Sequence, residues 1–144
     1  MQHNRKRHKL MGLDLGQRRI GLAVCHGTGR LVIPAGHLDR QTLKQDIDRL
    51  LGIARERQIE GFVAGLPYTL AGEVGAQAKR AQGFIRALRR RTNLPVYTVD
   101  ERFTTYEAEG LLREAGKQPS KKRGLVDATA AALILERFLA EEDG

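Results

Sequence analysis

A single aspartate, Asp14, stands between two glycines in an otherwise apolar stretch of the chain. In an extended strand alternate side chains share a face, so Gly12, Asp14 and Gly16 would point one way and their bulkier neighbours the other. Glycine within a strand often marks the close approach of a ligand or of another part of the backbone. The pattern predicts a carboxylate with room beside it for a metal ion or a phosphate. The alternative is a plain hairpin turn with a solvated aspartate.

Three further acidic residues, at two places in the chain, are candidates for the same chemistry. Asp100 and Glu101 follow the short β-branched stretch 95–99, and strand alternation alone does not choose between them. Asp127 begins an apolar stripe when residues are counted by three and four along the stretch 124–139. A carboxylate on such a stripe must be paired, hydrogen-bonded or bound to a metal, unless it only complements the helix dipole at the amino terminus.

Carboxylates brought together at one place repel one another. Two unit charges about 4 Å apart cost on the order of 4 kcal/mol at an effective dielectric of 20. Such a cluster therefore makes sense chiefly around Mg²⁺ or Mn²⁺, which prefer oxygen ligands. The single cysteine and the four histidines show no zinc-like spacing.

Apolar periodicity predicts the elements that must position these carboxylates. Strands and helices alternate after an opening antiparallel meander, which indicates one α/β domain. Either Thr42 or Asp39 would cap the first helix. The expected strands cover 10–15, 20–25, 31–33 (interrupted by Pro34), 61–66 and 95–99, and the expected helices cover 42–58, 72–91, 104–114 and 124–139.

Length and composition are those of an ordinary globular chain. The 144 residues suit a single domain, which we place at 10–140, after a basic arm at 1–9 that is disordered or solubilising and before an acidic tail at 141–144. No apolar run is long enough to cross a membrane and no secretory leader is recognisable, so a cytoplasmic location with no membrane partner is expected.

The net charge of +8 favours a polyanionic partner, with nucleic acid as the first candidate and solvated surface charge as the alternative for each cluster. A glycine- and proline-containing loop, 65–72, follows a predicted strand at the edge where α/β sheets usually bind ligands. We expect Gly65, Pro67 and Gly72 to face a phosphate there. The candidate residues for gripping nucleic acid are Arg18, Arg19, Arg102, Thr104, Lys121 and Lys122.

Four segments together resemble one protein family, the YqgF proteins, also called RuvX. The segments are GLDLGQRRIGLA (12–23), GLP (65–67) followed by Gly72, DERFTT (100–105) and KRGLVDATAA (122–131). The resemblance implies a ribonuclease H-like fold: a five-stranded mixed sheet, three strands antiparallel and then two parallel, flanked by helices. It also implies that Asp14, Glu101 and Asp127 are the catalytic, metal-binding residues, and it leaves the role of Asp100 to hydrogen bonding in the loop.

The activity implied by the resemblance is phosphodiester hydrolysis that depends on Mg²⁺ or Mn²⁺. The favoured substrate is RNA, in 5′-end maturation of the 16S ribosomal RNA precursor, with precursor particles as further partners. One alternative is a Holliday junction resolvase similar to RuvC, which would need a homodimer, whereas RNA trimming can be done by a monomer. Another is a non-catalytic RNA- or ribosome-binding module. The phosphate loop of actin-like ATPases is also similar, but those proteins close two such domains around a nucleotide.

Overall fold

The computed structural model describes residues 9–26, 31–69, 71–102, 110–116 and 123–143. The sheet has the strand order β3-β2-β1-β4-β5, with β1 antiparallel to β2 and parallel to β4. The five strands are β1 (Leu10–Leu15), β2 (Arg19–His26), β3 (Leu31–Asp39), β4 (Gly61–Leu66) and β5 (Val96–Asp100). The predicted mixed sheet, three strands antiparallel and then two parallel, is confirmed.

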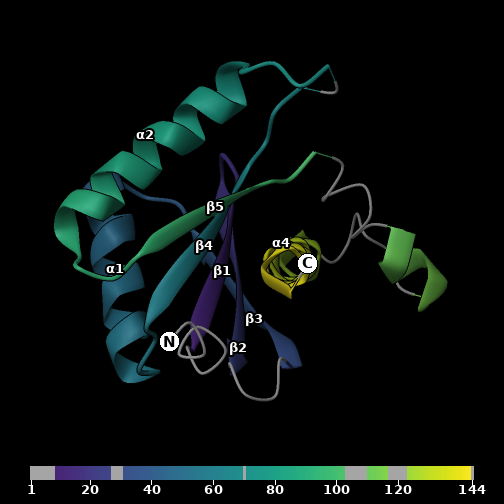
Figure 1. Cartoon of the computed structure of the whole chain (residues 1–144), viewed down its shortest axis with the longest axis horizontal. Helices are drawn as coiled ribbons and strands as arrows, with labels where there is room; N and C mark the ends of the chain where they lie inside the picture. The colour runs from purple at the N-terminus through teal and green to yellow at the C-terminus, as the bar shows by residue number, and fades with distance from the viewer. Residues whose placement is uncertain (1–8, 27–30, 70, 103–109, 117–122, 144) are drawn as a thin grey trace.

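Helices cover both faces of this sheet (Figure 1). On one face lie α1 (Leu43–Glu56) and α2 (Ala76–Arg91), and on the other lies α4 (Arg123–Asp143). Residues 110–114 form a further short helical segment. The arrangement leaves the central strand β1 between two helical layers, so that each of its side chains enters one of two cores.

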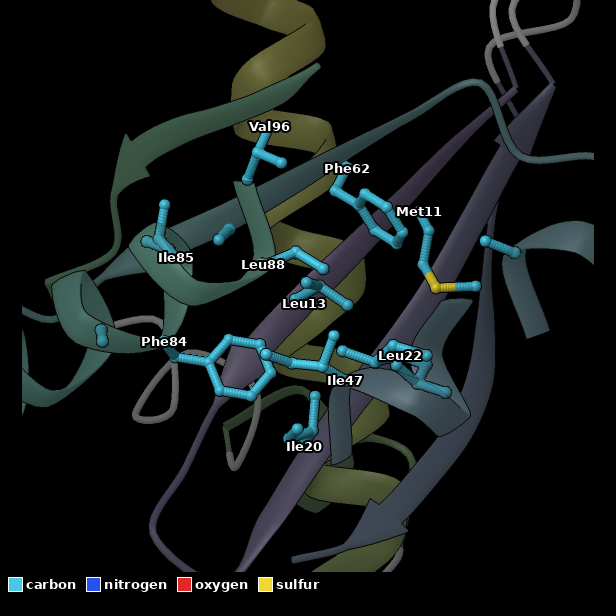
Figure 2. Packing of buried hydrophobic residues seen from close by; sticks show 14 of the residues in the cluster. Met11, Leu13, Ile20, Leu22, Ile47, Phe62, Phe84, Ile85, Leu88 and Val96 are labelled. Carbon is cyan, nitrogen blue, oxygen red and sulfur yellow. The ribbon is translucent and has the colours of Figure 1, made fainter. Parts of the chain in front are cut away.

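The two cores divide the strands by alternation. Met11 and Leu13 of β1 pack with Ile47 of α1 and Leu88 of α2, as Figure 2 shows. Leu10 belongs instead to the core beneath α4. Asp14 is an even-numbered residue of the same strand as Leu10, so its side chain starts from the α4 face, as the strand pattern predicts.

Helix α1 begins where the sequence offers a capping box. The Thr42 side chain accepts a hydrogen bond from the Gln45 backbone N–H at 3.1 Å, and the Gln45 side chain accepts one from the Thr42 backbone N–H. Of the two candidate caps, Thr42 is therefore the one used. Asp39 is the last residue of β3 instead.

Three predicted boundaries are wrong. Strand β3 does not stop at Pro34 but continues to Asp39, because β3 is an edge strand with a register shift on its partner opposite this point, where a missing N–H is tolerated. Helix α2 begins at Ala76 rather than at residue 72. Helix α4 begins at Arg123 and continues through most of the expected acidic tail to Asp143.

Some expectations fall outside the described residues. The basic arm lies there except for Lys9, and so do Thr104, Lys121, Lys122 and most of the predicted helix 104–114. In the described part of the chain, no helix is both long enough and apolar enough to cross a membrane.

Candidate active site

Helix α4 approaches the sheet unusually closely because glycines line its path. A Cβ atom built on Gly21 would lie 2.0 Å from the backbone oxygen of Asp127, and one on Gly12 would lie 2.7 Å from that of Ala131. Only glycine allows a helix backbone to come this near to a strand. The glycines were predicted to leave space beside Asp14 for a metal ion or a phosphate. Part of that space is filled by α4, which carries Asp127 to the same end of the sheet.

Glu101 reaches the same place from the end of β5. Val99 packs in the core beneath α4, so Glu101, two residues further, continues the same alternation. Its side chain fills the space left by Gly65, where a Cβ atom would lie 2.6 Å from the Glu101 carboxyl carbon. Gly65 is therefore required for the placement of Glu101, and its expected role of facing a phosphate stays a prediction.

The carboxyl groups of Asp14 and Glu101 are hydrogen-bonded to each other. Burial, the nearby charge of Asp14 and this hydrogen bond together raise the pKa of Glu101 to about 9. Burial and the charge of Asp127 raise the pKa of Asp14 to about 7, although the hydrogen bond from Glu101 opposes that shift. A protonated Glu101 therefore donates to the Asp14 carboxylate, and Asp127 is close enough to act on Asp14.

Asp127 is held by an arginine. Arg19 Nε donates to Asp127 Oδ2 at 2.5 Å, and the two side chains are 28% and 19% exposed, so solvent screens the pair only in part. Asp127 thus has the counter-ion that its place on a core-facing stripe demanded. Arg19, a candidate residue for gripping nucleic acid, thus pairs with Asp127 in this structure, and its contact with nucleic acid stays a prediction.

Asp100 has a different partner from its neighbour. Arg102 donates to both Asp100 carboxylate oxygens, with Nη2 at 2.6 Å from Oδ2, and the hydrogen bond to Arg102 lowers the pKa of Asp100 despite its partial burial. The Asp100 backbone oxygen accepts from Arg137 of α4 at 2.6 Å. Asp100 and Arg102 therefore brace the loop, and Arg137 adds a positive charge that opposes the rise in the pKa of Glu101.

In the loop after β4, several backbone amides are already hydrogen-bonded to carbonyl groups, so a ligand would meet mainly side chains. The N–H groups of Tyr68, Thr69 and Gly72 donate to the carbonyls of Leu66, Glu73 and Thr69. Gly72 has a φ of +84° and lies against the Arg102 guanidinium. Pro67 and Tyr68 line a cavity of about 870 Å³ that also contains Asp14, Glu101 and Asp127.

A buried ionic network fixes the turn that follows Asp14, and the sequence analysis did not find it. Asp46 of α1 is fully buried and accepts from Arg40 Nε, Arg49 Nη2 and the Gln41 N–H, each at 2.8 Å. Burial alone would raise the pKa of Asp46, but these hydrogen bonds lower it. Arg40 Nη1 in turn donates to the Gly16 carbonyl at 2.8 Å. An acidic residue on the apolar face of a predicted helix was the available signal.

The carboxylates of Asp14, Glu101 and Asp127 are suited to bind a divalent cation, but in this structure they are not positioned to hold one. Carboxylate oxygens are the ligands that Mg²⁺ and Mn²⁺ prefer, and the proton shared by Asp14 and Glu101 is what a cluster of acids retains when no cation neutralises it. Among the described residues, no group of three acidic, histidine or cysteine side chains stands ready to hold a metal. Asp127 would have to exchange Arg19 for the cation.

Solved structures share this fold. Thermus thermophilus RuvC in complex with a Holliday junction substrate gives a TM-score of 0.56 at 18% identity, covering 94% of this chain and 96% of that chain. Fowlpox virus resolvase with Holliday junction DNA gives 0.57 at 8% identity, covering 93% and 98%. Such low identities establish the fold alone. The molecule has the ribonuclease H-like fold of RuvC-type nucleases, as predicted.

Sequence comparison identifies the family. The model of the RuvX family, described as Holliday junction resolvase, matches residues 8–141, and the chain belongs to this family of nucleases. A relative from Acaryochloris marina is 41% identical over 137 residues, covering 95% of each chain. One from Synechococcus sp. is 42% identical over 132 residues, covering 92% of this chain and 89% of that one. Both are named as candidate pre-16S rRNA nucleases.

Proposed function

We propose that this protein is a divalent-metal-dependent nuclease that hydrolyses phosphodiester bonds in the 16S ribosomal RNA precursor, at its 5′ end, in the cytoplasm. The observation that carries the proposal is the hydrogen-bonded pair of Asp14 and Glu101 with Asp127 acting on it. These residues come from β1, the end of β5 and α4, and a purely structural role does not require three acids to meet. The names of the relatives supply the RNA substrate.

Asp14, Glu101 and Asp127 would hold one or two Mg²⁺ or Mn²⁺ ions. When bound, the metal supplies an activated water and stabilises the leaving oxygen. The chain's own residues do the rest. Glu101 releases to solvent the proton that it shares with Asp14, Arg40 holds the turn at Gly16, and the exposed Arg18 on that turn contacts phosphate.

The direct test is a cleavage assay with purified protein and Mg²⁺ or Mn²⁺. The substrates are a 16S precursor fragment, single-stranded RNA, single-stranded DNA and a four-way DNA junction. We expect cleavage of the precursor and a loss of about 10³-fold in Asp127→Asn, because a metal ligand contributes several kcal/mol to transition-state stabilisation. Asp39→Asn, an exposed acid on β3, is the control and should cleave like the wild type.

Each alternative has its own outcome in this assay. The description of the RuvX family favours the junction as second substrate, and cleavage of the junction alone, with a dimer in solution, would support a resolvase. RNA binding without metal-dependent cleavage would support a non-catalytic module. Either result would contradict the proposed activity.

The ion pair between Arg19 and Asp127 gives a prediction about metal binding. Without metal, Arg19→Gln should unfold at a lower temperature by about 2 to 6 °C, because it leaves Asp127 unpaired beside Asp14. Mn²⁺ should raise the unfolding temperature more in this variant than in the wild type, since the cation no longer has to displace Arg19. Thermal unfolding with EDTA or Mn²⁺ measures both effects. An equal gain in the two proteins would show that Arg19 and the metal do not compete, and Arg55→Gln controls for the loss of one positive charge.

A further inference from the structure

The cavity extends well beyond the three carboxylates. From Asp14 and Glu101 it continues between the loop after β4 and the first turns of α1 and α2. A cavity of about 870 Å³ lies within the range that encloses a whole small molecule. A metal ion with its water molecules would occupy only the acidic end. We call the part of its lining outside the acidic cluster the far end; it includes Gln41, Leu43, Tyr68, Gln77, Arg80 and Phe84.

The side chains at the far end can recognise an unpaired base. Tyr68 is half-buried and packs against the main core on one side, while it also forms part of the cavity wall. Aromatic side chains that line such a cavity can stack with bases of any sequence.

Gln77 and Arg80 line the same cavity as this ring. They are three residues apart on α2, so their side chains share one face of the helix, and both are exposed. Arg80 makes no ion pair with any residue of the described chain, in contrast to Arg40 and Arg102, which also line the cavity but are bound to Asp46 and Asp100. An amide and an uncommitted guanidinium supply hydrogen bonds and positive charge to a base edge or a phosphate.

We propose that the far end of this cavity binds an unpaired nucleotide of the RNA strand beside the phosphate to be cleaved. Tyr68 stacks on its base, and Gln77 and Arg80 contact its polar groups. The subsite rests on the proposed nuclease function and adds a substrate class to it: single-stranded RNA. A base inside an A-form helix is paired and stacked, so it cannot enter a cavity of this kind without leaving the duplex.

Binding without catalysis tests the subsite. The full-length protein in EDTA is titrated into a fluorescently labelled single-stranded RNA of ten nucleotides and, separately, into a hairpin duplex of equal charge. Tyr68→Ala should weaken binding of the single strand by about 5- to 100-fold, the range expected for the loss of one stacked base, and should leave duplex binding within twofold. Tyr68→Phe keeps the ring and should bind like the wild type.

Arg80→Ala provides a second variant, since this exposed side chain does not support the core. It should also weaken single-strand binding more than duplex binding. Arg57→Ala, an exposed arginine after α1 that does not line the cavity, is the matched control and should affect both RNAs equally and slightly. An excess of a mononucleotide that abolishes the difference between wild type and Tyr68→Ala would show that one nucleotide fills the subsite.

The outcomes separate the subsite from the nuclease activity. A selective loss in Tyr68→Ala and Arg80→Ala supports the subsite even if no RNA is cleaved. Wild-type affinity in both variants, an equal loss on single strand and duplex, or a wild type that does not bind single-stranded RNA would overturn it, even if cleavage depends on Asp14.

Discussion

Asp14→Asn is expected to abolish cleavage and yet to raise the unfolding temperature of the metal-free protein at pH 8. Cleavage should fall by about 10³-fold or more, because the variant loses a proposed metal ligand. Stability should rise because Asp14 is a partly buried acid next to Glu101 and Asp127, and an amide of the same shape carries no charge. The opposite signs of the two effects identify a site at which stability is given up for function.

The pH dependence follows from the direction of the pKa shifts. In the folded protein the pKa of Asp14 is raised to about 7 and that of Glu101 to about 9, from ordinary values of 3.8 and 4.5. Between about pH 4 and about pH 9 the folded state binds more protons than the unfolded state. The free energy of unfolding therefore falls as pH rises through this range. Protonation below that window restores the stability.

The size of the effect is measurable by thermal unfolding in EDTA at several pH values. At pH 8 we expect Asp14→Asn to gain about 1 to 3 kcal/mol, or about 3 to 10 °C, and to lose less stability than the wild type between pH 5.5 and 8.5. Mn²⁺ should stabilise the wild type but hardly affect the variant. An Asp14→Asn protein less stable than the wild type at pH 8 would contradict the buried acidic pair, and Asp39→Asn should change neither quantity.

Gly21→Ala is expected to be the most damaging of the small substitutions near the site. The new methyl group would lie 2.0 Å from the Asp127 backbone oxygen, and because that neighbour is backbone, no side-chain rotation relieves the overlap. Helix α4 must move away from β2. We expect a loss of about 3 kcal/mol in the free energy of unfolding, together with loss of cleavage, because Asp127 moves with the helix.

Gly52→Ala is the matched control for this substitution. Gly52 lies within α1, and a methyl group there would meet no atom within 4 Å. Alanine is the better helix former, so this variant should gain about 0.5 to 1 kcal/mol and keep full activity. Chemical denaturation of the three proteins measures the difference. A Gly21→Ala protein as stable as the wild type would show that α4 does not need this close approach.

The resemblance to the RuvX family supplied the five-stranded mixed sheet that the structure confirms. Strand alternation and helical periodicity by themselves predicted one α/β domain and marked Asp14 and Asp127 as candidate site residues. They failed to choose between Asp100 and Glu101 because β5 was treated in isolation. Once Val99 is known to face α4, the choice of Glu101 for the acidic cluster follows from alternation.

The residues that pair with or pack against the site residues could not be predicted, because they lie far from them in the sequence. Nothing local to Arg19 indicates that it pairs with Asp127, which is 108 residues away, rather than with a phosphate. Likewise, the dependence of Glu101 on Gly65 appears only when β4 and β5 lie side by side. Asp46 was the exception, since an acid on an apolar helical face could have been noticed. These misses concern the site rather than the fold, because sites are built from contacts between elements.

The position of α4 in chain order has a consequence for biosynthesis. All five strands precede it, so a chain emerging from the ribosome can pair its complete sheet before Asp127 has left the exit tunnel. Until then Asp14 and Glu101 lack their third acid, and the face of the sheet that bears them is uncovered. Under the proposed function, a nascent copy held beside ribosomal RNA has no complete metal site until α4 docks.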